Sequence, residues 1–500
     1  DFQMTNLVVK DPKGQFPATP LEAKMQVDAS LKKQVADVRQ FAITLTPTAR
    51  ATNQVQLSGQ VDMTNTNAIQ GNLKLVADSI DVTSYYDLFM AGKPTPGTGA
   101  APATTPTTAP ADPNKEPEAM KLPLHNFTAS AAIGHFYLHE VDIADWQTTV
   151  KIDGGHVVLN PFRLTLNGAP VNTTLDMDLG VPGWKYDWSL SAQAIPLAPL
   201  VNSFQPERKG ILSGTLTAQA KLAGAGTTGA SLQKHLTGQF DMASTNLNLS
   251  VDNIQGNTFY TRLLKTLAKT ITAIPELAKN PAGTATSLLQ GLTGLGGSST
   301  NSSGGATADL KKSPINAIVL RGTAGSGRVD LQNAVVQSPA FEALAKGTIT
   351  LAEVLTNSPI QIPVSVSLER SVAQRINMAG NTPTNATYAK LPDFLTMKGT
   401  LGSSKADINY VALASAALQG AGGKAGQAGG VLQSLSGMLS GGTNAASSGS
   451  TNSSGSKAGG LLQGLGGLLG TSAPAATNAP ATNASPVDNL IKGLFGPKKK

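Results

Sequence analysis

The feature that most constrains the fold is an alternation of apolar and polar residues between Gly210 and Ser250. In the first half, every second residue is apolar or small: Leu212, Gly214, Leu216, Ala218, Ala220 and Leu222. After a glycine-rich turn the same pattern returns at Leu236, Gly238, Phe240 and Met242. A period of two is typical of a β-strand, because successive side chains point to opposite faces of a sheet. The stretch therefore predicts two strands, each with one apolar face and one polar face.

The same alternation predicts strands through much of the chain. It recurs over residues 36–63, 71–78, 124–179 and 316–370. Charged residues make up only 14% of the chain and aromatic residues 5%, whereas glycine occurs 52 times and proline 30 times. This composition favours many short strands joined by turns over a compact helical enzyme.

The apolar faces of these strands need cover, and the sequence offers few long helices to provide it. Contiguous exposed apolar patches above a few hundred Å² are rare on soluble proteins. We therefore expect a mainly β protein, in which a long curled antiparallel sheet forms an elongated groove, with short helices and low-complexity insertions. The residues expected to line this groove are Val55, Leu57, Leu73, Leu75, Leu164, Leu175, Met177, Leu212, Leu216, Leu222, Phe240, Met242, Val364 and Val366.

Composition divides the chain into segments of different character. The apolar period is absent from proline-rich and glycine-rich stretches, which are typical of linkers. The expected segments are an N-terminal β segment (1–91), a Pro/Thr/Ala linker (92–123), a central β segment (124–253), an amphipathic basic helix with a Gly/Ser linker (254–312), a C-terminal β segment (313–411) and a Gly/Ala/Ser tail with short leucine-rich helices (412–500).

Two of the β segments contain an internal echo. The stretch that begins at Leu73 and ends at Phe89 parallels the stretch that begins at Trp188 and ends at Phe204. The matched positions are Leu75 with Leu190, Ala77 with Ala192, Ile80 with Ile195, and Phe89 with Phe204. Several strands followed by one short helical segment, used again, predict a repeat architecture.

The residues around this echo resemble the AsmA family of bacterial envelope proteins. The resemblance rests on G-x-L-x-G-x-L from Gly210, the A-G-x-G loop from Ala223, and L-x-x-x-L-x-G-x-F from Leu232. Residues 154–179 are similar to the strands that precede this signature in the family, and residues 394–410 to its closing strand. The resemblance implies a repeating β-groove fold, like that of bridge-like lipid transfer proteins. It offers no catalytic motif to map.

The resemblance and the groove pattern indicate the same function. The predicted lining is small and aliphatic, which suits flexible acyl chains better than a planar ligand. We expect an envelope protein that binds or conducts phospholipid along the groove between inner and outer membrane, in outer-membrane lipid homeostasis and assembly. The resemblance implies a periplasmic location, an inner-membrane anchor in a helix preceding Asp1, and contacts with other envelope proteins.

Two non-transporting alternatives remain open from the sequence. A curled sheet filled by its own side chains would be a periplasmic scaffold or an outer-membrane protein assembly factor. The other alternative is a secreted β-solenoid adhesin, which the irregular spacing of the strands disfavours. A continuous apolar trough would favour lipid transport, whereas a filled core would favour the scaffold.

The sequence gives no sign of catalysis, and we expect no enzyme, no cofactor and no nucleic-acid partner. Carboxylates are sparse and unpaired, and no nucleophile–base arrangement stands out. The absence of cysteine excludes disulfides and thiolate metal sites. His135 and His139 share a predicted strand face, but a metal site needs three or four converging ligands. The net charge of +7 suits anionic lipid headgroups, without the clustered basic and aromatic residues that nucleic acid needs.

The segment from Ile254 to Lys279 differs from the rest of the chain. Its apolar residues fall at helical spacing: Phe259, Leu263, Leu264, Leu267 and Ile271. Basic residues lie between them. This pattern predicts an amphipathic helix that lies on the rim of the groove or on a membrane surface.

Overall fold

The computed structural model describes residues 2–7, 21–91, 115–250 and 306–415, with short gaps at 381, 410–411 and 414. The predictions for residues 92–114, for the amphipathic segment up to 305 and for the tail beyond 415 lie outside the described residues.

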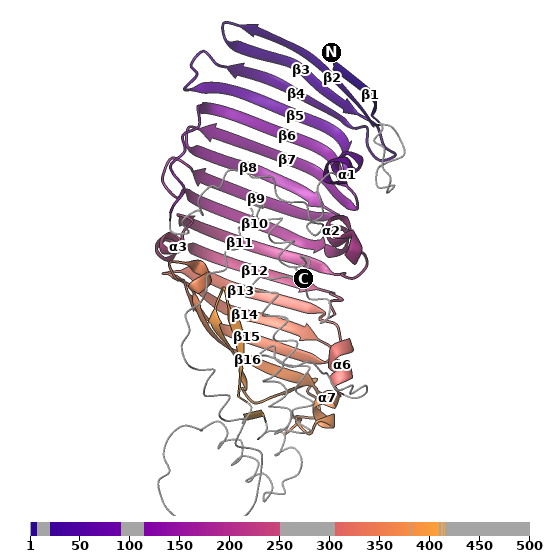
Figure 1. The fold of residues 1–500 in the computed structure, drawn as a ribbon, viewed down its shortest axis with the longest axis vertical. Helices are drawn as coiled ribbons and strands as arrows, with labels where there is room; N and C mark the ends of the chain where they lie inside the picture. The colour runs from indigo at the N-terminus through magenta and orange to yellow at the C-terminus, as the bar shows by residue number, and fades with distance from the viewer. Residues whose placement is uncertain are drawn as a thin grey trace, which may run out of the picture.

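The strands of the described residues form one 19-stranded sheet (Figure 1). They are β1 (Phe2–Leu7), β2 (Leu21–Lys32), β3 (Val35–Leu45), β4 (Gln54–Asp62), β5 (Ile69–Asp81), β6 (Leu124–Leu138), β7 (Val141–Asp153), β8 (His156–Leu166), β9 (Ala169–Asp178), β10 (Lys185–Pro196), β11 (Thr215–Ala225), β12 (Thr237–Thr245), β13 (Ala317–Gly325), β14 (Arg328–Ser338), β15 (Phe341–Thr350), β16 (Pro359–Glu369), β17 (Tyr388–Lys390), β18 (Leu395–Thr400) and β19 (Ser404–Ile408). The helices are α1 (Thr83–Ala91), α2 (Leu197–Phe204), α3 (Gly229–His235), α6 (Ala306–Lys312) and α7 (Arg370–Arg375), with single 3-10 turns η1 (Pro206–Arg208) and η3 (Leu355–Asn357).

From β1 to β16 the strands lie in the sheet in the order in which they occur in the chain; β17 and β18 both pair with β16, and β19 pairs with β18. Neighbours pair antiparallel from β1 to β5 and again from β6 to β16. β5 and β6 are parallel, so the chain must return across the width of the sheet between them. Within the described strands no pairing joins the first to the last, and the sheet is open. The expectation of a mainly β, mostly antiparallel sheet is confirmed.

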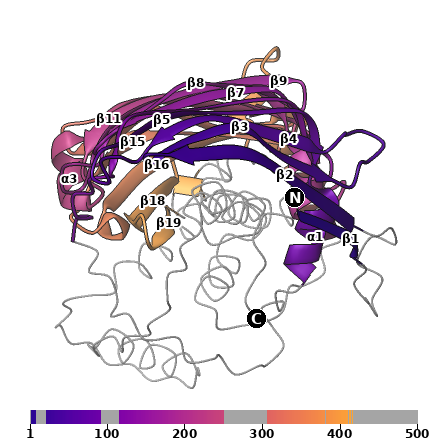
Figure 2. The ribbon, with the colours of Figure 1, turned by 90° about the horizontal axis from the view of Figure 1, so that it is seen from above.

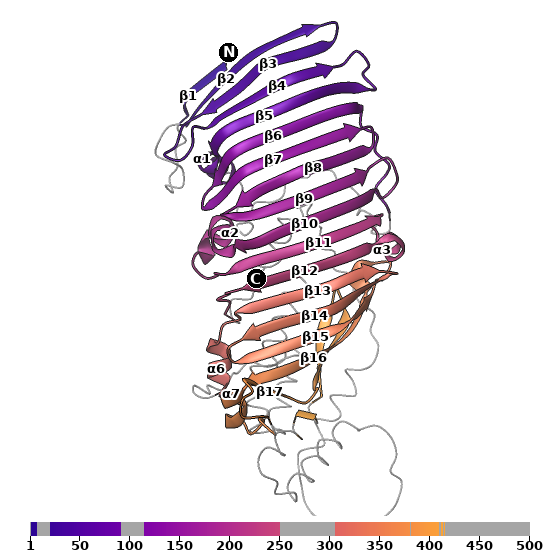
Figure 3. The same ribbon diagram turned by 180° about the vertical axis from the view of Figure 1, so that it is seen from behind.

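The sheet curls into an arch along its whole length. Figure 2, a view along the stack of strands, shows the concave side of the arch with β16, β18 and β19 folded in beneath β15. Helices α1, α2, α6 and α7 lie along one lateral rim, and α3 lies on the other (Figures 1 and 3). A curled sheet with helices only at its rims has a concave face that these helices do not cover.

The internal echo corresponds to a structural repeat. β5 is followed by α1 and β10 by α2, and both helices lie on the same rim (Figure 3). Ala77 and Ile80 of β5 are buried, as are Ala192 and Ile195 at the matched positions of β10. In both cases a short helix closes a group of five strands. The expected repeat is therefore visible in the structure.

Buried side chains are distributed unevenly along the arch. Two small clusters lie where β5, β6 and β10 approach their rim helices: Ala77, Ile80 and Ile133 form one, and Ala169, Ala192, Ile195 and Ala218 the other. A much larger cluster forms what we call the C-terminal core. It lies between the inner faces of β15, β16 and β18, helix α7 and the loops that connect strands on the side of the sheet where α2 lies. Its most buried members include Phe341, Val366, Leu368, Leu391, Phe394 and Met397.

Candidate functional site

Cross-strand register places the predicted apolar residues on one face of the sheet. In the first repeat Leu57 lies opposite Leu75, which lies opposite Ala131 of β6. Farther along, Leu175 lies opposite Trp188, which lies opposite Leu222. Directly paired residues in a sheet project to the same side. The apolar positions therefore form continuous rows that cross the strands.

This apolar face is the concave one. Met242 of β12 pairs with Leu320, and the row continues through Ala334 and Ala345 to Val364 of β16. Val364 belongs to the C-terminal core. That core is enclosed where β16, β18 and β19 fold in under the arch (Figure 2). Among the described residues, the same face of the sheet is thus enclosed at the C-terminal end and left uncovered upstream.

Most of the predicted lining residues are partly exposed on this concave face: Val55, Leu57, Leu73, Leu75, Leu164, Leu175, Met177, Leu216, Leu222, Phe240 and Met242. We call this surface, from β2 to β12, the open apolar face. At its N-terminal end Val27 and Leu31 of β2 are 50% and 68% exposed. Val27 pairs with Phe41, which pairs with Leu57, so it belongs to the same face. The open apolar face therefore extends as far as β2, the first long strand of the sheet.

Three predicted lining residues do not lie on the open apolar face. Val364 and Val366 are buried in the C-terminal core. Leu212 is also buried there, in the connection between α2 and β11, and packs in the same cluster as Val201. The alternation that includes Leu212 is misleading, because β11 begins only at Thr215, after Gly214 adopts φ +114°. The prediction that these three line an open groove is wrong.

One glycine on this face shows how the surface is shaped. A Cβ atom at Gly322 of β13 would lie 2.6 Å from Cζ of Phe240. The ring of Phe240 therefore lies over the backbone of the neighbouring strand. A side chain at position 322 would push the ring away. Phe240 thus spreads across two strands at the point where the open apolar face meets the C-terminal core.

Aromatic side chains that the sequence analysis did not include also lie on the open apolar face. Trp146 of β7 contacts Phe136 and Phe162 edge-on or tilted, with ring centroids 6.3 and 6.0 Å apart. Trp188 of β10 donates from Nε1 to Oγ1 of Thr173 at 3.0 Å. Trp146 alternates with Thr148 and Val150 along β7, and this period of two could have predicted that its side chain lies on the apolar face. Phe162 was hidden because the strand pairing shifts between Leu159 and Phe162.

Two polar atoms on this face have no hydrogen-bond partner among the residues that the structure describes. Nε1 of Trp146 and Oγ1 of Thr148 are buried without a hydrogen bond. They are two residues apart on β7 and therefore share a face. Buried polar groups without partners are uncommon. The part of the chain that the structure describes therefore leaves two buried polar atoms unsatisfied beneath the middle of the open apolar face.

The opposite, convex face is polar and carries cross-strand ion pairs. Arg321 donates from Nε to Oδ2 of Asp241 at 2.8 Å. His156 Nε2 lies 2.8 Å from Oδ1 of Asp176. Such exposed pairs contribute little stability individually. Their positions show that the convex face carries solvated charged side chains, whereas the concave face carries apolar ones.

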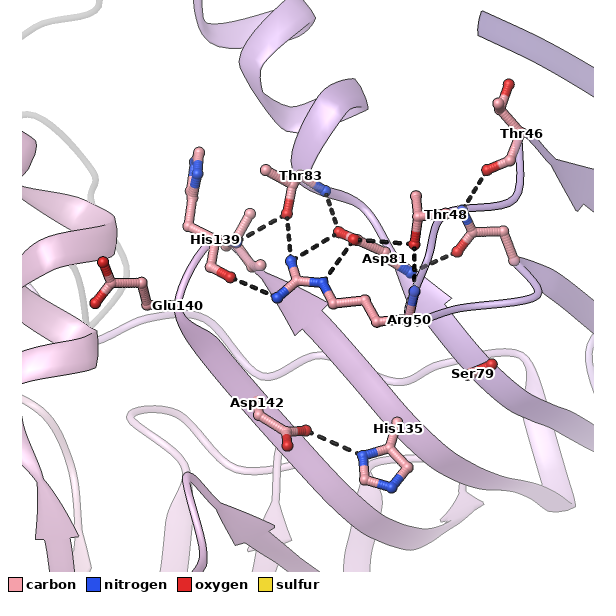
Figure 4. Close-up of polar contacts among 12 residues, drawn as sticks. Thr46, Thr48, Arg50, Ser79, Asp81, Thr83, His135, His139, Glu140 and Asp142 are labelled. Carbon is pink, nitrogen blue, oxygen red and sulfur yellow. Dashed lines mark hydrogen bonds and ion pairs between the residues drawn. The ribbon is translucent and has the colours of Figure 1, made fainter. Parts of the chain in front are cut away.

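The α1 rim is held by a network centred on Arg50 (Figure 4). Its guanidinium donates to both oxygens of Asp81 at 2.8 and 3.2 Å, to Oγ1 of Thr83 at 3.1 Å and to the carbonyl of His139 at 2.8 Å. It also lies 4.6 Å from the ring centre of Tyr137. These contacts join the β3–β4 loop, the start of α1 and the β6–β7 turn. The network fixes the first rim beside the small buried cluster of Ala77, Ile80 and Ile133.

Asp81 is ionised within this network. Burial alone would raise the pKa of its carboxyl group. The hydrogen bonds from Arg50 and Thr83 outweigh burial and hold the pKa below its ordinary value. The carboxylate therefore has a structural role as the partner of Arg50.

The α3 rim is held by residues 115–123, which we call the rim strap. Glu116 accepts hydrogen bonds from the backbone N–H groups of Thr227 and Thr228 at 2.8 and 3.1 Å and from the Thr228 hydroxyl. Burial acts to raise the pKa of Glu116, but the hydrogen bonds from Ser231, Thr228 and Thr227 lower it to about 2. Farther along, the N–H of Met120 donates to the carbonyl of Leu179. The strap ties together hairpin turns that are distant in sequence.

His135 of β6 and His139 of the β6–β7 turn do not converge on one point. His135 Nδ1 lies 3.1 Å from Oδ1 of Asp142, and His139 Nε2 lies 3.0 Å from Oδ1 of Asp87. The described residues contain no group of three or more potential metal ligands. Their side chains are engaged in separate pairs at the rim.

Comparison with known proteins identifies the family of the chain. No described helix is long and apolar enough to cross a membrane. No curated protein and no solved structure gives a match. A family model described as the AsmA family matches residues 14–293, more than half of the chain. This span runs through β2–β12 and contains the open apolar face. The chain therefore belongs to the AsmA family of cell-envelope proteins.

Proposed function

We propose that this protein binds phospholipid by holding its acyl chains against the open apolar face, and that it takes part in lipid homeostasis of the outer membrane. The observation that carries the proposal is the continuous, partly exposed row of apolar side chains from β2 to β12. A soluble protein normally covers such a surface. In this proposal lipid provides the cover.

The shape of the face suits an elongated flexible ligand. Ten strand-to-strand steps separate β2 from β12, and at about 4.8 Å per step the face is about 48 Å long. Its side chains are mainly Leu, Val, Ala and Met. Each methylene of a ligand that leaves water here contributes about 0.8 kcal/mol. Hydrocarbon chains can therefore bind without any specific polar contact.

The polar elements of the structure fit the same proposal. The convex face, with its charged and amide side chains, can remain in water while the concave face holds lipid. We place the protein in the periplasm, with the inner and outer membranes as lipid donor and acceptor.

Site-specific photo-crosslinking tests the proposal. A crosslinking residue at Leu216 or Met242, on the open apolar face, should capture phospholipid in cells. The matched controls are Gln219 and Gln239, which are exposed on the convex face of the same two strands. Equal lipid capture from both faces, or none from Leu216 and Met242, would contradict lipid binding at this face.

A scaffold is the second candidate function, and the C-terminal core favours it for that end of the molecule. The substitution Leu216→Asp separates the two. If the face holds lipid and water, the carboxylate stays hydrated, so the protein folds but binds less lipid. If the face is packed by the protein itself, an unpaired buried carboxylate destabilises the fold by several kcal/mol. Circular dichroism melting and lipid content of the purified variant are the two measurements.

A further inference from the structure

The two ends of the concave face differ in a way that bears on the route of lipid. At the β2 end, Val27 and Leu31 are the most exposed apolar side chains of the face. At the other end, Phe341 of β15 and Val366 of β16 are 1% and 0% exposed. Both ends belong to the same side of the sheet, because the cross-strand rows connect them.

The C-terminal end is filled by protein. The inner faces of β15 and β16 pack against Leu395 and Met397 of β18 and against Val372 of α7. Inner residues of β13 and β14, such as Ile318 and Leu331, pack on the same core. Figure 2 shows the strands responsible, β16, β18 and β19, folded in under the arch. An acyl chain on this path would have to displace close-packed side chains.

We propose that the groove is blind: it opens at the β2 end and terminates at β13, so lipid is loaded and released upstream of β13 and does not pass the C-terminal end. This inference rests on the proposed lipid function and specifies where lipid can enter and leave. Both the lipid donor and the lipid acceptor must then engage the protein upstream of β13, and the exposed Val27 and Leu31 point to the β2 end as the place of exchange. Phe240, whose ring lies over Gly322, is the last partly exposed residue of the open apolar face before the C-terminal core.

Tryptophan quenching by brominated lipid tests where the groove ends. The three native tryptophans are replaced by phenylalanine, and single tryptophans are introduced by Phe41→Trp, Phe240→Trp or Phe341→Trp. All three positions lie on the same side of the sheet, and each swap conserves an aromatic ring. Vesicles of phosphatidylethanolamine and phosphatidylglycerol with bromine on their acyl chains serve as the probe.

The expected result is strong quenching at positions 41 and 240 and at least tenfold weaker quenching at position 341. Phe394→Trp, in the same core and 2% exposed, replaces Phe341→Trp if that variant fails to fold. Equal quenching at 240 and 341, or at 240 and 394, overturns the blind groove but not lipid binding. Quenching at none of the positions overturns both.

The rate of quenching tests the β2 end as the place of exchange. Leu31→Asp adds charge at an exposed position, so folding should be unaffected, and loading of Phe240→Trp should slow several-fold. The matched control is Val181→Asp, at a residue 38% exposed in the β9–β10 turn, which should load at the unaltered rate. An unchanged rate in Leu31→Asp would show that lipid uses another route and would overturn this part of the inference.

Discussion

Strands β2–β12 and strands β13–β19 share one sheet and one alternation pattern, yet only the second group builds a core. In the first group the inner side chains are partly exposed and only two small buried clusters occur. In the second, the sheet curls tightly enough for its inner face to pack on itself. The same alternation therefore gives an interior where β16, β18 and helix α7 pack on the face, and a partly exposed surface where they do not.

The two regions must also be stabilised differently. The C-terminal region has close packing, whose removal is costly. The N-terminal region depends on backbone ladders between neighbouring strands, as in repeat proteins where each unit contacts only its neighbours. Its rims are fixed by polar contacts, the Arg50 network on one side and the rim strap on the other.

A matched pair of phenylalanines should show the contrast most strongly. Phe341→Ala removes a ring that is 1% exposed and should destabilise the protein by about 3–5 kcal/mol. Phe240→Ala removes a partly exposed ring and should destabilise it by roughly 1–2 kcal/mol. Urea unfolding of lipid-free protein measures both. Similar losses for the two variants would contradict the division into an open and a packed region.

Arg50→Met tests whether polar contacts replace a core at the α1 rim. The substitution leaves Asp81, whose side chain is 8% exposed, without its partner. We expect a loss of roughly 2 kcal/mol, less than for a fully buried pair because Arg50 itself is partly exposed. Arg321→Met, on the convex face, is the control and should change stability by less than about 1 kcal/mol. Hydrogen exchange localises the effect, which should appear in residues 46–53 and 81–91; uniform protection in the variant would count against the network.

The rim strap should respond to acid through Glu116. Its pKa in the folded protein, about 2, lies below the ordinary value of 4.5. The charged carboxylate therefore stabilises the folded state above about pH 4.5, and this contribution is lost as the pH falls toward 2. Glu116→Gln should weaken the strap at neutral pH and remove this part of the acid dependence. Limited proteolysis at residues 115–123 between pH 7 and 3 is the measurement; an identical pH profile in variant and parent would refute the assignment.

Substitution of two tryptophans on the open apolar face should change the free energy of unfolding least. Trp188→Phe removes the hydrogen bond to Thr173 and should destabilise the protein by about 1 kcal/mol. Trp146→Phe removes a donor that has no partner, so its effect should be smaller than about 0.5 kcal/mol in lipid-free protein. Thermal unfolding compares them. A larger loss at Trp146 than at Trp188 would mean that the Trp146 indole is satisfied within the protein.

Most of the fold could be predicted from local pattern. Strands such as β4, β5 and β12 alternate cleanly, and their partners in the sheet are mostly their neighbours in the chain, so register follows from short turns. The family resemblance rested on residues 154–179 and 210–240, which lie within the span that the family model matches, and on residues 394–410, which lie outside it. Where pairing shifts, as between Leu159 and Phe162, the period of two fails locally, and Phe162 was missed for that reason.

By itself the sequence determined which side chains share a face, because a period of two is a property of the strand backbone. The echo between Leu75 and Leu190 likewise revealed the repeat, since equivalent turns and helices need equivalent residues. Only the tertiary structure decided which of these faces are covered. Leu216 and Val366 obey the same alternation, but Val366 lies where β16 and β18 close over it. The strap from Glu116 to Thr228 joins residues more than a hundred positions apart. Contacts of this kind depend on how the whole sheet curls, and no local pattern encodes that curvature.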